Sequence, residues 1–163
     1  MNTRVSDPKN ISSLNDQELL TRFSSLVEGE RKMTVGVLIH LAEVDRRKLY
    51  LKAGFSSLFS YLTETFHYAG GAAYRRIQVA RLIQRFPQII VSLERGDFNL
   101  TTLSLIAPHL GEENREDLLS KIIHKSKEEV ESLISSLFQI ERSSQRDLIR
   151  LLPVKEMGSF ENK

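Results

Sequence analysis

Apolar residues along this chain recur at intervals of three and four positions, and no long stretch alternates between apolar and polar residues. This spacing is typical of amphipathic helices that bury one face, so the sequence predicts an all-α protein. Asn15 and Glu18 have the spacing of a capping box, which predicts a long N-terminal helix from Asp16 to about Leu51. The apolar stripe of its first half comprises Leu19, Leu20, Phe23, Leu26 and Val27.

Shorter helices are expected after Gly54, because serine, asparagine and proline residues mark helix starts and glycine marks helix ends. The expected ranges are 57–66, 71–85, 87–96, 103–110, 114–124 and 126–138. The candidate caps are Ser56 or Ser57, Asn99 or Thr101, and the capping-box pair Ser126 and Glu129. We expect residues 1–14 to form a disordered lead, residues 15–140 to form one helical domain, and residues 141–163 to form a C-terminal extension or tail. The predicted fold is a multi-helix bundle.

Residues 62–77 have the pattern of a helix-turn-helix at the centre of this bundle. Leu62 and Phe66 are expected to face the core from the first helix, and Ala73 and Ile77 from the second, because each pair is spaced i, i+4. His67 stands where such a turn usually has glycine, and histidine can adopt the left-handed conformation at some cost. The residue before the second helix is Ala69 and not a capping serine or threonine.

The net charge of the whole chain is only +2, but the charges are unevenly distributed. Residues 70–95 contain five arginines and one acidic residue, a local net charge of +4. Residues 112–131 contain seven acidic residues and four lysines or arginines, a local net charge of −3. The basic block coincides with the second helix of the helix-turn-helix, and it suits a phosphate backbone.

The candidate DNA-contacting residues lie on the expected exposed face of this second helix. The glycines would let the backbone approach a phosphate, Tyr74 and Gln78 could hydrogen-bond to bases or phosphates, and arginine can fork onto guanine. The candidates are Gly70, Gly71, Tyr74, Arg75, Gln78, Arg81 and Arg85. A secondary basic cluster, Arg46, Arg47 and Lys48, could flank the duplex.

A purely structural interpretation of the same helix stays open, since arginine stems also cover apolar surface and many basic helix faces are only solvated.

The sequence gives little support for metal binding, cofactor binding or catalysis. The chain has no cysteine, so disulfides, zinc knuckles, iron–sulfur clusters and thiol catalysis are excluded. No two of its four histidines have the i, i+4 spacing of metal ligands, and no GxxxxGK phosphate loop is present. We therefore expect no metal, no cofactor and no enzymatic activity.

The N-terminus is polar and lacks the apolar core of a secretory signal. No apolar run approaches the roughly 18 residues needed to span a bilayer. We expect a cytoplasmic protein without a membrane partner.

Several linked motifs resemble the N-terminal helical region of bacterial HNH-endonuclease-type proteins. The motifs are the segments 42–50, 54–59, 71–82, 107–114 and 125–127, and the similarity covers roughly residues 14–138. Residues 61–110 are also similar to the helix-turn-helix and following helices of ParB-type partition proteins. Both resemblances imply contact with double-stranded DNA. The nuclease module of the first family needs a ββα metal finger, which this chain lacks before it stops at Lys163, so we do not carry nuclease activity over.

The alternative function is a helical interaction or dimerisation module. The long N-terminal helix could pair with its copy in a homodimer, because Leu19, Phe23, Leu26 and Val27 form a broad apolar stripe. A dimer without nucleic-acid affinity would favour this alternative. A dimer that binds DNA is compatible with the DNA-binding hypothesis, since paired recognition helices read paired half-sites.

Overall fold

The computed structural model describes residues 11–137, and every regular element that they form is a helix. This confirms the all-α prediction. Most of the predicted lead and the whole of the predicted extension 141–163 lie outside the described residues. The contacts divide the chain into two compact units, residues 1–125 and residues 126–163.

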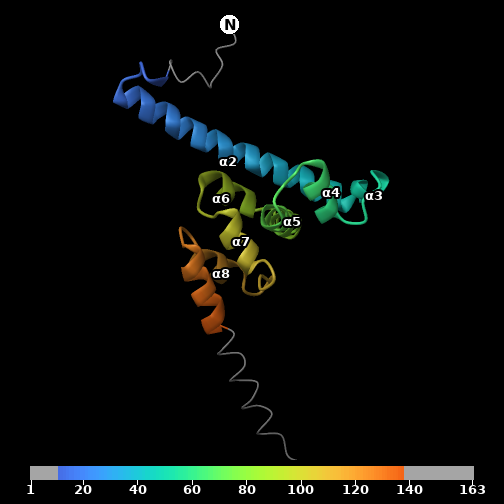
Figure 1. Ribbon diagram of the computed structural model, residues 1–163. Coiled ribbons are helices and arrows are strands. Elements are labelled where there is room, and N and C mark those ends of the chain that lie inside the picture. The colour runs from blue at the N-terminus through green and yellow to red at the C-terminus, as the bar shows by residue number, and fades with distance from the viewer. Residues whose placement is uncertain (1–10, 138–163) are drawn as a thin grey trace, which may run out of the picture. The chain divides into compact units, whose positions relative to one another are not determined.

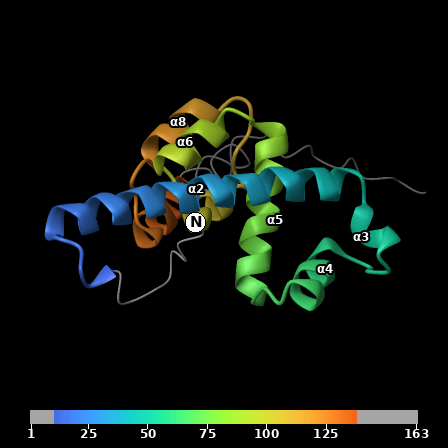
Figure 2. The same ribbon diagram turned by 90° about the horizontal axis from the view of Figure 1, so that it is seen from above.

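The first unit begins with the long helix α2 (Asp16–Arg46). The predicted capping box is present: Asn15 Oδ1 accepts from the backbone N–H of Glu18, and the Glu18 carboxylate accepts from the backbone N–H of Asn15. The helix runs unbroken through Gly29 and Gly36, and it is the longest element in both Figure 1 and Figure 2.

Helix α2 ends five residues before the predicted end at Leu51, because Lys48 adopts a left-handed conformation with φ 55°. A continuous helix would turn Tyr50 away from the buried face of α2. The break at Lys48 instead lets Tyr50, in the short helix α3 (Leu49–Lys52), become buried. Local helical spacing alone could not predict this redirection.

The remaining helices of the first unit are short, apart from α5. They are α4 (Leu58–Thr65), α5 (Gly70–Arg85), α6 (Ile89–Arg95), α7 (Leu100–Ile106) and α8 (Arg115–Lys121). Of the alternative caps, Ser57 and Asn99 are the ones used, because each side chain accepts from a backbone N–H in the first turn of its helix. Helix α7 starts and ends earlier than expected, because Asn99 and not Thr101 caps it and the following turn buries Leu110.

Helix α5 is the centre of this unit and packs against α2, α4 and α7. Figure 2 shows α5 crossing α2, with α4 beside the N-terminal end of α5. Among the residues that fill the core are Leu38 of α2, Val79 and Leu82 of α5, Phe86, and Leu103 of α7, each at most 1% exposed. The core therefore holds α5 on several sides and leaves only a strip of its surface open.

In the second unit, residues 127–137 are helical. The predicted capping box at its start is confirmed, since Ser126 and Glu129 each accept from the other's backbone N–H through their side chains.

Candidate nucleic-acid interface

The turn between α4 and α5 is built by residues 66–69. His67 has φ 55°, which confirms that histidine takes the left-handed position. The Tyr68 N–H donates to the Leu62 carbonyl oxygen at 3.3 Å. The Arg76 guanidinium lies 4.4 Å from the centre of the Tyr68 ring and donates to the Ala72 carbonyl oxygen, so Arg76 is a packing residue.

The open surface of α5 is one narrow stripe along the helix. Ala73 and Ile77 are buried as predicted. The stripe residues are spaced by four, four, three and four positions, and this spacing keeps them on one face. They are Gly70, Tyr74, Gln78, Arg81 and Arg85. The predicted residues Gly71 and Arg75 lie at the edge of the stripe.

The side chains of this stripe are accessible. Tyr74 is 51% exposed, Arg81 and Arg85 are exposed, and Gln78 and Arg75 are half-buried. An external partner can therefore reach the predicted site residues. Helix α5 contains four arginines and no acidic residue.

The N-terminal turn of α5 adds backbone donors to this surface. Ala69 precedes the helix without a side-chain cap, and its carbonyl oxygen accepts from Ala72 and Ala73. Within the described residues, the N–H groups of Gly70 and Gly71 have no acceptor. Such free N–H groups, with the positive end of the helix dipole, favour an anion.

The Arg75 side chain folds back toward these donors. A Cβ atom added to Gly71 would lie 3.4 Å from Arg75 Nη1. Arg75 makes no ion pair or hydrogen bond with any residue in 11–137, so its guanidinium is available to a partner. The glycines and this arginine together place N–H donors and a positive charge at one end of α5.

Two other arginines of the stripe, which the sequence allowed as phosphate contacts or packing residues, are tethered to partners that the sequence did not indicate. Arg81 Nε donates to Asp45 Oδ2 of α2 at 2.7 Å. Arg85 Nη2 donates to the Leu110 carbonyl oxygen at 3.0 Å, and its guanidinium lies 4.9 Å from the Phe86 ring centre. Both side chains are exposed, but each holds two segments of the fold together as well as contributing charge.

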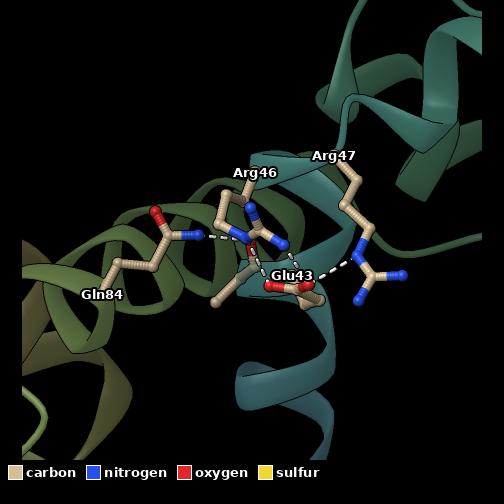
Figure 3. A network of polar contacts seen from close by, with 5 residues as sticks. Glu43, Arg46, Arg47 and Gln84 are labelled. Atoms are coloured by element: carbon tan, nitrogen blue, oxygen red, sulfur yellow. Dashed lines mark hydrogen bonds and ion pairs between the residues drawn. The ribbon is translucent and has the colours of Figure 1, made fainter.

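The secondary basic cluster at the end of α2 is largely neutralised by local acids (Figure 3). Glu43 accepts from Arg46 through both carboxylate oxygens and also from Arg47 Nε. Hydrogen bonds from Arg46 and Arg47 lower the pKa of Glu43 from 4.5 to about 2. Lys48 Nζ lies 3.6 Å from Asp45 Oδ1. Each cation of the cluster thus lies beside a carboxylate, although Lys48 shares Asp45 with Arg81, and the free positive charge is smaller than the sequence indicates.

The same region ties α2 to α5 through a second contact. Gln84 Nε2 donates to the Ala42 carbonyl oxygen, as Figure 3 shows beside the Glu43 network. Together with the Asp45–Arg81 pair, this contact fixes the end of α2 against the C-terminal half of α5.

Asp45 is the residue of this region that sequence reasoning missed. It is 6% exposed, and its position one turn after Leu41 and one heptad after Leu38 places it on the buried face of α2. A carboxylate on an apolar helix face requires a cation. The spacing from Leu38 and Leu41 could have indicated that Asp45 is buried. It could not have identified the partner, because Arg81 is 36 residues away in the sequence.

The predicted burial of Phe66 is wrong. Leu62 is buried, but Phe66 is 54% exposed, because it follows the last turn of α4 and packs edge-on against Tyr61 at the surface. Phe59 of α4 is also exposed and lies 3.5 Å from where a Cβ of Gly70 would be. Exposed aromatic rings therefore stand next to the N-terminal end of α5.

Within residues 11–137, no three carboxylate or imidazole groups are placed together to hold a metal ion. Over the same part of the chain, none of the helices combines the length and apolar character needed to cross a bilayer. No protein-family model, curated protein sequence or solved structure matches this chain. The resemblances described above therefore stay predictions.

Proposed function

We propose that this protein binds double-stranded DNA through the helix-turn-helix of α4 and α5, with the N-terminal half of α5 in the major groove. The observation that carries the proposal is the open stripe of α5, on a helix with four arginines and no acidic residue. We assign the protein a regulatory role, or one associated with the nucleoid or a mobile element, in the bacterial cytoplasm. The proposal includes no catalytic step.

The proposal divides the stripe into residues that read bases and residues that hold the backbone. Tyr74, Arg75 and Gln78 are the base or phosphate contacts, because their polar atoms have no competing protein partner within the described chain. The N–H groups of Gly70 and Gly71 bind a phosphate. Arg81 and Arg85 add charge near the phosphates while keeping their contacts to the fold.

Fluorescence anisotropy titrations of labelled duplex DNA at several salt concentrations test this proposal. Arg75→Ala removes one cation that makes no ion pair or hydrogen bond in residues 11–137. We expect affinity to fall about tenfold. We also expect the slope of log K against log salt to become less steep by about 0.9, the value for one phosphate contact.

Lys121→Ala is the control, because it likewise removes one positive charge, but from α8, where Lys121 pairs with Asp117. Its affinity and salt slope should equal those of the unsubstituted protein. If Arg75→Ala and Lys121→Ala behave alike, or if the unsubstituted protein does not bind duplex DNA, the assignment is wrong.

An interaction module is the second candidate function. The observation that favours it is the exposure of Leu20, Phe23 and Leu26 on α2, which are 57–63% exposed. An apolar helix face of this length is typical of a surface that another protein covers. The two functions are compatible, because dimeric helix-turn-helix proteins read paired half-sites.

A further inference from the structure

An exposed seam runs along α2 with the spacing of a coiled coil. Its members are separated alternately by four and three positions over three heptads, which is the a/d pattern. The seam residues are Leu19, Phe23, Leu26, Glu30, Met33, Val37 and His40. All seven are exposed, and the five apolar ones are 40–73% exposed.

This seam is distinct from the face of α2 that packs in the unit. The buried residues Val35, Leu38, Ala42 and Asp45 are centred about a third of a turn around the helix from it, and the buried residue Leu41 lies between the two faces. In Figure 1 and Figure 2, the N-terminal turns of α2 extend past the other helices of the unit. The apolar seam is therefore not explained by the folding of the described chain.

Two glycines flank the seam on the side away from the buried face of α2. Gly29 and Gly36 are one heptad apart, and a Cβ added to either would meet nothing within 4 Å. Glycine destabilises a helix interior, and nothing in residues 11–137 requires it at these positions. A second helix that approaches the seam closely would require small residues there.

We propose that α2 pairs with α2 of a second copy of this chain in an antiparallel two-helix coiled coil, with the twofold axis beside residue 28. This alignment places Leu19 opposite Val37 of the other copy and Phe23 opposite Met33. Each pair of facing residues combines a side chain from the N-terminal half of the seam in one copy with a side chain from the C-terminal half in the other copy. The seam is thus complementary to itself.

Charge decides the orientation. In a parallel, in-register pair, Asp16, Glu30 and His40 would each face their own copies, and two Glu30 carboxylates would meet in the seam. The antiparallel pair instead places Asp16 opposite His40 of the other copy. It also places Glu30 opposite Leu26, one turn from Arg22, whose guanidinium can reach that carboxylate.

The glycines fit the same register. With the axis beside residue 28, Gly29 lies alongside Gly29 of the second copy, and Gly36 lies alongside Arg22. The two backbones can therefore come closest at the centre of the pair. This inference rests on the second proposed function and does not depend on DNA binding.

Single-cysteine variants test the orientation, because the natural chain has no cysteine. Leu19→Cys and Val37→Cys proteins are prepared separately, mixed and oxidised. We expect the mixed disulfide between the two variants to dominate, with little cross-linking of either variant alone. Positions 19 and 37 are about 27 Å apart along one helix, so they cannot join within a chain. A Leu19→Cys protein that cross-links efficiently to itself would contradict the antiparallel alignment.

The molar mass from light scattering tests whether the α2 seam is a dimer interface. At roughly 50 μM, which populates a dimer of micromolar Kd, the full chain should have twice the monomer mass of 18.7 kDa. Leu26→Glu should give the monomer mass. Ile39→Glu is the matched control, because Ile39 is 41% exposed but lies on the other side of α2, and this variant should stay dimeric.

A monomeric unsubstituted chain overturns the proposal, whatever else covers the seam, and so does a dimer that tolerates Leu26→Glu. A monomer that binds DNA would leave the DNA proposal intact. A dimer without DNA affinity would support the coiled-coil proposal and contradict the DNA proposal. Failure of one proposal can therefore be told from failure of the other.

Discussion

The ion pair between Asp45 and Arg81 stabilises the fold and also involves a residue of the proposed DNA-binding site. The carboxylate is buried and the guanidinium is half exposed, with 2.7 Å between Asp45 Oδ2 and Arg81 Nε. Asp45 Oδ1 is buried without a hydrogen bond in the described chain, and the nearest cation beside Arg81 is Lys48 at 3.6 Å. Loss of Arg81 would therefore leave a poorly compensated buried charge.

Arg81→Ala is expected to lower the free energy of unfolding by about 2 kcal/mol, less than for a fully buried pair because Arg81 is half exposed. Arg75→Ala should change it by less than about 0.5 kcal/mol. Urea denaturation of both variants measures the difference. Equal stability of the two variants would mean that the pair does not hold α5 against α2. It also follows that Arg75, and not Arg81, is the cleaner residue for DNA-binding tests.

The lowered pKa of Glu43 predicts how the stability of the folded chain depends on pH. This pKa is lowered to about 2 by Arg46 and Arg47, so the pairing stabilises the folded chain above pH 4.5 and is lost as the pH falls through about 2. A carboxyl ¹³C NMR titration should find Glu43 still ionised at about pH 3. In the double variant Arg46→Ala, Arg47→Ala, the midpoint should return toward 4.5. A midpoint near 4.5 in the unsubstituted protein would rule out the network.

At the scale of elements, local signals predicted where helices start better than where they end. Asn15, Ser57, Asn99 and Ser126 were among the candidate caps, and each caps a helix. Such caps can be found from sequence because they depend on a side chain and a backbone group three residues away. The end of α2 at Arg46 was missed, because it depends on the burial of a residue beyond the helix.

The helix-turn-helix turn can be tested at His67, whose φ of 55° is strained for a residue with a Cβ. His67→Gly should raise the free energy of unfolding by about 1 kcal/mol, because glycine has no steric cost there. His67→Val should lower it, since β-branched residues tolerate this region worst. Thermal denaturation of the two variants should therefore move the Tm in opposite directions. A His67→Gly protein less stable than the natural one would show that the imidazole itself stabilises the turn.

For the whole molecule, the sequence predicted the all-α class, the helix-turn-helix and the exposed face of α5. It could not predict which arginines of that face are tethered, because Asp45 and Leu110 lie far from them in sequence. It likewise overestimated the free charge of Arg46, Arg47 and Lys48, although the local acids Glu43 and Asp45 were visible. Helical spacing shows which residues share a face but not which partners they find.

The central claim is that the N-terminal end of α5 meets DNA, and amide NMR spectra of ¹⁵N-labelled protein test it directly. Glycine amides fall in their own spectral region, so Gly70 and Gly71 can be followed without a substitution. On addition of duplex DNA at moderate salt, the account predicts large shifts of these two amides and little change at Gly96 and Gly111. Unmoved Gly70 and Gly71 amides, with or without shifts elsewhere, would contradict it.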